Sequence, residues 1–244
     1  MKNYKITLQY DGTKYNGWQK QGNTKNTIQE KFENVLFRMC DSNVEIHASG
    51  RTDAGVHALC QVANFKCETH LSEDEIMDYL NSYLPDDILV TSISVAGERF
   101  HSRLNAVSKT YEYLVATQKP DVFLRKYVYR TNEIPDIQKM KSAALLLLGT
   151  HDFKGFSSVK KTNKSTVRTI NSIDITENEG IIKITINGNG FLYNMVRIIA
   201  GTLLDIGTGK ISEDVIPKVF AEQKRDMAGT TLPPQGLKLV KVFY

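Results

Sequence analysis

The order of predicted elements repeats along this chain, and that repetition limits the folds open to it more than any other feature. Periodicity and turn signals in the first half predict a strand, a helix, two strands, a helix and a strand, at residues 5–10, 28–39, 44–49, 61–66, 73–84 and 88–95. Both helices begin at a capping box, Thr27–Glu30 and Ser72–Glu75, and Pro85 ends the second. This β-α-β-β-α-β order is that of a ferredoxin-like unit.

The second half gives the same order. Tyr111, Tyr113 and Val115 indicate a strand, and the next helix is opened by Pro135–Asp136 and closed by Gly149. The remaining predicted elements are two strands, an apolar helix, a short helix and a strand, at 170–176, 181–187, 191–206, 212–223 and 237–243. We therefore expect an α+β fold of two ferredoxin-like halves, 1–104 and 105–244. Their strands would form a mixed, mostly antiparallel sheet, with a basic cleft between the halves where a ligand binds.

The charge of the chain is modest and unevenly distributed. Its 244 residues include 31 Lys+Arg and 27 Asp+Glu, for a net charge of +4. Residues 105–244 hold 20 basic and 13 acidic residues, whereas residues 1–104 hold 11 and 14. This asymmetry is a weak indication of a polyanionic partner such as nucleic acid, and a solvated basic surface explains it equally well.

The cysteines and the apolar segments predict the compartment. Cys40, Cys60 and Cys67 lack the spacing of a metal site, and an odd number of cysteines suits a reducing environment. The longest apolar run, 143–148, is far shorter than the ~20 residues of a membrane span, and the N-terminus lacks the apolar core of a signal peptide. We expect a cytoplasmic protein with no membrane contact and no bound metal.

Familiar cofactor and hydrolase signatures are missing from the sequence. The segment 188–193 lacks the third glycine of a dinucleotide fingerprint, and 207–211 lacks the first glycine of a phosphate loop. There is no G-x-S-x-G elbow. NTP hydrolysis, nicotinamide chemistry and serine hydrolysis are therefore disfavoured, and no cofactor is expected.

One loop, Ser49–Ala58, carries residues suited to catalysis. Asp53 stands among small residues that leave room for a substrate, with glycines on both sides that permit close approach. The charge of Arg51 favours the ionised form of the Asp53 carboxyl group. From the residues alone, a hairpin whose Asp and Thr bond to their own turn explains the segment at least as well.

A resemblance changes this balance. The segment Gly50–Ala58 (GRTDAGVHA) resembles the signature of the tRNA pseudouridine synthase A family. Further segments resemble that family in the same order, namely 10–13, 17–19, 27–30, 100–103, 109–113, 149–153, 167–170, 190–192 and 195–197. The resemblance covers essentially the whole chain. It departs from the family at 230–237, where Leu232 is larger than expected and Gln235 replaces an acid, so a paralogue with shifted target positions stays open.

The resemblance implies the pseudouridine synthase fold and the isomerisation of uridine to pseudouridine in tRNA. The expected targets are positions 38, 39 and 40 of the anticodon stem-loop, and the reaction needs no cofactor. Asp53 would be the catalytic carboxylate. It would stabilise positive charge on the sugar, attack C1′ or remove the 2′ proton, and these three roles stay open. A homodimer is also implied.

We expect substrate-binding roles for Tyr111 and Arg197, which match the family, and for Arg51 and Arg103, whose charge suits contact with RNA. Tyr111 would stack on the base or relay the C5 proton. Arg51 would help to extrude the target nucleotide, and Arg197 would pair with Asp53. Ordinary alternatives exist, because a strand tyrosine also suits sheet packing and an arginine within a helix can pair with another acid.

A basic run in a Ser/Thr-rich loop predicts contacts with the RNA backbone. It consists of Lys160, Lys161, Lys164 and Arg168. Such residues position RNA without reading its sequence, and a mobile solvated loop is the alternative interpretation.

Other functions remain open on the residues. A non-catalytic RNA-binding protein with a ferredoxin-like sheet is one, although the aromatic pattern of an RNA-recognition motif is missing. An Asp-dependent glycosidase or nucleoside hydrolase is another, with Asp11 or Asp152 as the second acid that such an enzyme needs. Both aspartates are better explained as turn or cap residues. A paralogous pseudouridine synthase acting on another RNA is the third.

Overall fold

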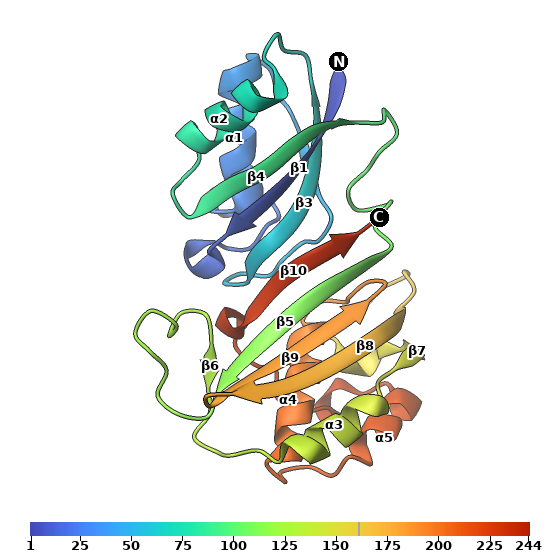
Figure 1. The fold of residues 1–244 in the computed structure, drawn as a ribbon. Coiled ribbons are helices and arrows are strands. Elements are labelled where there is room, and N and C mark those ends of the chain that lie inside the picture. The colour runs from blue at the N-terminus through green and yellow to red at the C-terminus, as the bar shows by residue number, and fades with distance from the viewer. Residues whose placement is uncertain (161) are drawn as a thin grey trace. The chain divides into compact units, whose positions relative to one another are not determined.

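The computed structural model describes residues 1–160 and 162–244, and the chain divides into two compact units. The first unit comprises Met1–Val107 with Leu239–Tyr244, and the second comprises Ser108–Lys238. Each unit combines helices with a sheet (Figure 1). The predicted α+β fold with mostly antiparallel strands is confirmed.

The first unit is built on an antiparallel ladder in the order β4-β1-β3. The short β2 pairs with β3, and β10 also neighbours β3. Side chains alternate along β1, so that Tyr4, Ile6 and Leu8 are buried on one face of the sheet. The elements of this unit are β1 (Lys2–Tyr10), α1 (Ile28–Cys40), β2 (Ile46–Ala48), β3 (His57–Cys67), α2 (Glu73–Tyr83), β4 (Ile88–Ala96) and, from Leu239 onward, β10 (Leu237–Phe243).

The second unit carries the ladder β5-β9-β8-β7, which is antiparallel at each step, and β6 adds a short parallel pairing to β5. Helix α4 is buried over most of its length because its residues are apolar on nearly every side. The elements of this unit are β5 (Ser108–Ala116), β6 (Tyr129–Arg130), α3 (Ile137–Leu145), β7 (Gly149–Asp152), β8 (Val167–Asn178), β9 (Ile181–Gly188), α4 (Met195–Gly207) and α5 (Val215–Glu222).

Two predicted helix boundaries are wrong. Helix α4 starts at Met195 and not at 191, because Asn194 adopts a left-handed conformation (φ 61°) that α-helical backbone does not continue through. Helix α3 ends at Leu145, and Gly149, with φ 92°, opens the unpredicted strand β7 instead of closing the helix.

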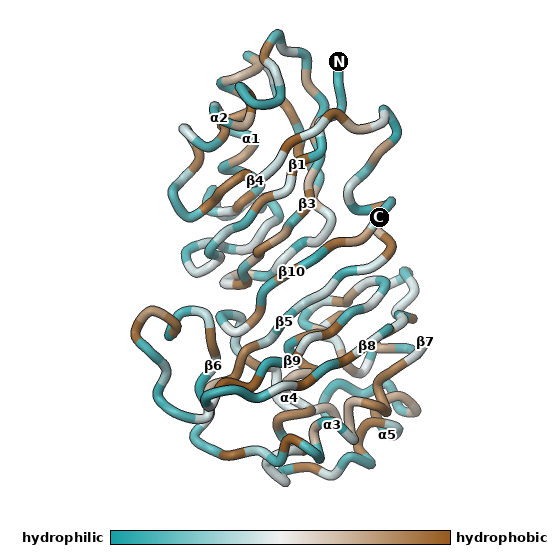
Figure 2. The backbone as a smooth tube through the Cα atoms, viewed as in Figure 1, coloured by the Kyte–Doolittle hydropathy of each residue, from teal (hydrophilic) through white to brown (hydrophobic). Residues whose placement is uncertain are grey.

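The segment 117–134 is a long connection in the second unit between β5 and α3, and it contains β6. Its tip is apolar and exposed, as the brown stretch before β6 in Figure 2 shows, and it contains Val122, Phe123 and Leu124. No helix in the described part of the chain is long and apolar enough to cross a membrane.

Candidate active site

Asp53 lies in the first unit, in the loop between β2 and β3 that the sequence singled out. Its side chain is half-buried, Arg51 is exposed, and Thr52 between them is buried. The Asp53 carbonyl accepts a hydrogen bond from Val56 N–H at 3.1 Å, which closes the turn before β3. The Arg51 side chain of this loop therefore extends into solvent, whereas the Thr52 side chain packs into the core.

The buried side of this loop is held by polar groups of β1 and β3. The hydroxyl groups of Tyr10 and Thr52 are hydrogen-bonded at 2.7 Å. Gln61 is fully buried, accepts from Ser49 Oγ at 2.7 Å and from Gly50 N–H at 3.2 Å, and donates to Gly50 O at 2.7 Å. Burial raises the pKa of Tyr10 to about 12, so its hydroxyl stays protonated at neutral pH. The sequence analysis assigned no role to Gln61. The available signal was a polar residue at the start of the predicted strand 61–66.

A second segment, residues 12–18, holds the loop from its other side. Trp18 N–H donates to Thr52 O at 3.0 Å, and Gly55 N–H donates to Tyr15 O at 3.2 Å. Contact here is so close that a Cβ atom on Gly12 would lie 2.0 Å from the Val56 carbonyl oxygen. A Cβ on Gly17, which has φ 87°, would lie 2.7 Å from Thr52 O. The absence of side chains at these two glycines therefore allows the segment 12–18 to pack directly against the backbone of the Asp53 loop.

The candidate second acids are both turn caps. Asp11 accepts from Thr13 N–H at 2.9 Å at the start of the 3₁₀ turn Gly12–Lys14, and its Oδ1 lies 3.1 Å from His57 Nδ1. Asp152 accepts from Lys154 N–H at 3.0 Å at the start of the turn Phe153–Phe156. The interpretation of both residues as caps is confirmed.

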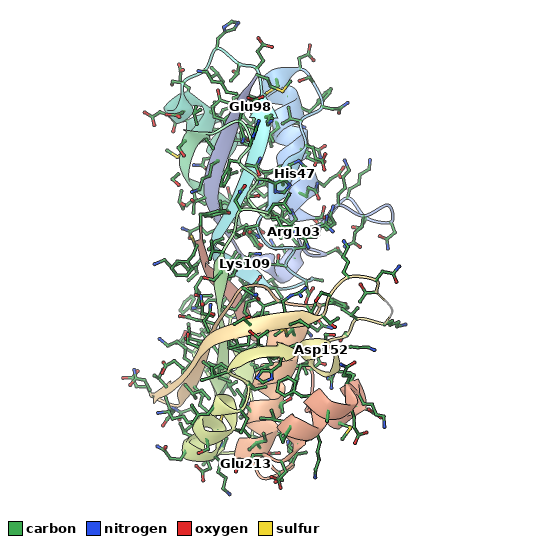
Figure 3. The ribbon with its side chains drawn as sticks, turned by 90° about the vertical axis from the view of Figure 1, so that its right-hand side faces the viewer. His47, Glu98, Arg103, Lys109, Asp152 and Glu213 are labelled. Carbon is green, nitrogen blue, oxygen red and sulfur yellow. The ribbon has the colours of Figure 1, made fainter. Side chains whose placement is uncertain are left out.

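Arg103 also belongs to the first unit, in the segment that follows β4. Its side chain is exposed, and its backbone N–H donates to His101 Nδ1 at 3.1 Å. Figure 3 labels Arg103 together with His47, whose ring stacks on that of His101 at 4.9 Å.

Tyr111 and Arg197 lie in the second unit. Tyr111 is buried in β5, and its ring packs edge-on against Phe191 at 5.1 Å. Arg197 stands in the first turn of α4, where its Nε donates to Leu232 O at 2.6 Å and its Nη1 donates to Asn194 Oδ1 at 2.8 Å. These bonds fix the direction of the guanidinium within its own unit.

Leu232, one departure from the family pattern, has a local explanation. It is buried, and a Cβ on Gly201 of α4 would lie 3.3 Å from its Cγ and 1.8 Å from Thr230 O. The bare backbone of Gly201 therefore leaves room for the Thr230 carbonyl and for the Leu232 side chain beside α4.

The predicted basic run is only partly exposed. Lys160 and Lys164 are exposed, and Lys161 lies outside the described residues. Arg168 donates through Nη1 to Ser165 O at 2.9 Å and to Val167 O at 2.6 Å, and burial lowers the pKa of its guanidinium. Arg168 thus braces the loop end, whereas the two lysines extend into solvent.

A search of the described residues finds no group of three or more His, Cys, Asp and Glu side chains that could hold a metal ion.

Comparison with known proteins identifies the family. A family model for tRNA pseudouridine synthase matches residues 6–105 and 143–244. tRNA pseudouridine synthase A 2 of Bacillus cereus is 43% identical, and tRNA pseudouridine synthase A 1 of Clostridium tetani is 49% identical, each over 245 residues and 100% of both chains. tRNA pseudouridine synthase A of Acetivibrio thermocellus is 43% identical with the same coverage.

Among solved structures, the crystal structure of a Cbf5-Nop10-Gar1 complex aligns with 97% of this chain and 48% of that chain. The alignment has a TM-score of 0.38 and a sequence identity of 11%.

The family match covers most of the chain, and the relatives match it from end to end. Their names describe synthases of a modified nucleoside, and pseudouridine synthases are isomerases. The prediction of an enzyme is therefore confirmed over that of a non-catalytic RNA-binding protein. This chain belongs to the tRNA pseudouridine synthase family and is an isomerase of uridine in tRNA.

Proposed function

We propose that this enzyme forms pseudouridine at positions 38, 39 and 40 of the tRNA anticodon stem-loop and that Asp53 is its catalytic carboxylate. The observation that carries the proposal is the setting of Asp53. Its loop is held by buried hydrogen bonds to Gln61 and Tyr10 and by backbone bonds to residues 15–18, while the Asp53 side chain is only half-buried. A carboxylate carried by a loop that is held in this way is suited to chemistry on a bound ligand.

The reaction moves the glycosidic bond from N1 to C5 of the same uracil. The N1–C1′ bond breaks, a C5–C1′ bond forms, C5 loses a proton and N1 gains one, so nothing is oxidised overall. Positive charge develops on the sugar as the first bond breaks. Asp53 would stabilise that charge, bond to C1′ or take the 2′ proton, and each role needs one anionic oxygen near the ribose. A glycosidase needs a second carboxylic acid, and Asp11 and Asp152 are engaged as turn caps.

The target positions are tested with tRNA transcripts that keep uridine at only one of positions 38, 39 and 40, with cytidine at the other two. We expect each single-uridine transcript to gain one pseudouridine at that position, as mapped by mass spectrometry of nuclease fragments. A transcript with cytidine at all three positions is the control and should gain none there. Pseudouridine found only outside these positions would contradict the assignment and favour a paralogue with another target.

Tyr111 is proposed to contact the substrate uracil, by stacking or by relaying the C5 proton. We expect Tyr111→Phe to keep the ring packing against Phe191 and to lower kcat by at least about tenfold, because only the hydroxyl is lost. Tyr113→Phe is the matched control, since it removes a hydroxyl that donates to Pro233 O at 2.6 Å. That variant should lose about 1 kcal/mol of stability and keep kcat. Equal kcat values for the two variants would refute the relay of the C5 proton by the Tyr111 hydroxyl, because stacking needs only the ring.

The three arginines are proposed as further substrate contacts. Arg51, exposed beside Asp53, is assigned to extruding the target nucleotide, so Arg51→Ala should bind folded tRNA and lose turnover on it. Arg197, oriented by Asn194 and Leu232, and the exposed Arg103 are assigned to holding the bound tRNA.

Lys160 and Lys164 are proposed to contact tRNA phosphates. Replacing both with Gln should reduce the slope of log Kd against log salt concentration by about two, because two fewer counterions are released on binding. The matched control is the pair Lys139→Gln and Lys141→Gln, which removes two exposed lysines from the region of α3. If the double variant at Lys160 and Lys164 keeps the wild-type slope of log Kd against log salt concentration, neither lysine contacts a tRNA phosphate.

Two further proposals concern the assembly and the location of the enzyme. A homodimer is proposed from the family resemblance, and a cytoplasmic location from the cysteines and the short apolar segments of the sequence. Light scattering of the purified enzyme should give twice the chain mass. A monomer that is fully active at assay concentration would rule out the dimer as a requirement. Cell fractionation that places the enzyme with membranes or outside the cell would contradict the location.

A further inference from the structure

The segment that follows β4, residues 97–107, covers one face of the sheet in the first unit without forming a helix or strand. Side chains alternate along a strand, so Asn3 and Asn64 face away from the side on which Tyr4 and Phe65 lie. Both asparagines are nonetheless buried, each with 3% of its surface exposed. Burying two amides on a sheet face is unfavourable unless their N–H and C=O groups form hydrogen bonds. The hydrogen-bond partners of Asn3 and Asn64 therefore show which segment the two side chains hold in place.

The partners of both amides are the backbone of the 97–107 segment. Asn3 Nδ2 donates to Gly97 O and to Phe100 O, each at 2.9 Å. Asn64 Nδ2 donates to Asn3 Oδ1 at 3.1 Å, and Asn64 Oδ1 accepts from Ser102 N–H at 2.8 Å. The two side chains thus form one connected network that fixes an irregular stretch of chain.

Ser102 is the point on which this network converges. It is fully buried; its hydroxyl donates to His47 O, and its carbonyl accepts from the Tyr244 hydroxyl at 2.7 Å. The Tyr244 ring packs against Phe100 at 5.2 Å, with Lys5 Nζ 4.7 Å from the Tyr244 ring centre. Every backbone and side-chain polar group of Ser102 therefore has a partner in the first unit.

The two neighbours of Ser102 in the chain, His101 and Arg103, have side chains that reach the surface. Arg103 is exposed, and His101 packs against the half-exposed His47. Because the Ser102 backbone is held at both N–H and C=O, the direction in which Arg103 leaves the sheet is fixed. A pre-organised arginine loses less conformational entropy when it binds a phosphate than one on a free loop does.

We infer that Asn64 is a positioning residue for tRNA binding. Through Ser102 it holds the 97–107 segment so that the Arg103 guanidinium meets a tRNA phosphate, and Asn3 and Tyr244 complete the network. This inference rests on the proposed role of Arg103 as a substrate contact.

The test measures tRNA Kd over a range of salt concentrations. Arg103→Ala sets the reference: it should weaken binding about tenfold at low salt and reduce the salt slope by about one. Asn64→Ala should weaken binding and reduce the slope to a similar extent, with kcat at saturating tRNA kept near wild type. In the Arg103→Ala background, Asn64→Ala should weaken binding no further, because the two residues act through one contact.

Asn81→Ala is the matched control for a loss of fold stability. Asn81 also makes a two-bond contact from a partly buried amide, to Val90 N–H at 2.8 Å and Val90 O at 2.9 Å, but it joins α2 to β4. It should lower Tm without altering the salt slope. Tyr244→Phe removes one bond to Ser102 from a partly exposed ring, so it carries the test if Asn64→Ala does not fold.

The outcomes separate the inference from the proposals on which it rests. The positioning role alone would be overturned if Arg103→Ala reduces the salt slope of tRNA binding and Asn64→Ala leaves it at the wild-type value. Tyr244→Phe takes the place of Asn64→Ala in this comparison if Asn64→Ala does not fold. A wild-type slope in Arg103→Ala would overturn the phosphate contact and the positioning role together. Formation of pseudouridine by the wild-type enzyme, measured separately, decides whether the proposed reaction stands in either case.

Discussion

Asp53→Asn is expected to lower the rate of pseudouridine formation by at least about 10³-fold while tRNA binding stays within a few fold of wild type. Asparagine has the size of aspartate but lacks the anionic oxygen that each of the three proposed roles requires. The backbone bond from Val56 N–H to the carbonyl of residue 53 does not depend on the side chain, so the turn should persist. Single-turnover assays with saturating enzyme measure the chemical step, and filter binding measures Kd.

Asp152→Asn is the matched control for this prediction. Asp152 is also a half-buried aspartate at a turn, but it lies in the second unit, where its side chain caps the turn Phe153–Phe156 by accepting from Lys154 N–H at 3.0 Å. Its variant should lose at most about 1 kcal/mol of stability and keep its turnover rate. Turnover by Asp53→Asn within tenfold of wild type would remove Asp53 from the chemistry.

Gly12→Ala is expected to destabilise the enzyme by about 3 kcal/mol or more and to reduce its activity beyond that loss of folded protein. The added Cβ would lie 2.0 Å from the Val56 carbonyl oxygen and 2.6 Å from its carbon. Both atoms are backbone, so relief requires that the start of β3 moves away from residue 12. Because the Asp53 carbonyl accepts a hydrogen bond from Val56 N–H, that movement displaces the Asp53 loop as well.

The control for the glycine prediction is Gly22→Ala, because a Cβ at Gly22 would have no atom within 4 Å. That variant should match the wild type in Tm and in kcat. Urea unfolding gives the stability change of both variants, and assays at saturating tRNA and low temperature give kcat per folded enzyme. A Gly12→Ala enzyme of wild-type stability would show that the close approach to Val56 is not a constraint.

Local signals predicted much of the fold, and tertiary contacts account for what they missed. The capping box at Ser72 forms as predicted, with Glu75 Oε2 accepting from Ser72 N–H at 2.8 Å. At Thr27 only the hydroxyl half of the predicted box caps the helix, because the Glu30 carboxylate pairs with Lys20 at 3.2 Å. Strand β7 forms because its four residues pair with β8. A strand of four residues is too short to be predicted from the alternation of polar and apolar residues.

The candidate site shows the same division. The sequence identified the Asp53 loop through a nine-residue motif, since a motif is local by nature. It did not identify Gln61, Tyr10 and Gly12 as the residues that hold the loop, because their contacts join positions up to 45 residues apart. Nor did it predict the Asn3–Asn64 network, since a polar residue in an alternating strand normally faces solvent and both are covered by a segment without regular structure.

Tritium release from uracil C5 tests the central claim most directly. A tRNA transcript labelled at C5 is incubated with wild-type enzyme and with Asp53→Ala, without added cofactor or metal. We expect the wild type to release tritium to water in proportion to the pseudouridine formed. We expect the variant to bind the transcript and to release none. Equal release by the folded variant would contradict the role of Asp53, and no release by the wild type from any tRNA would contradict the proposed reaction itself.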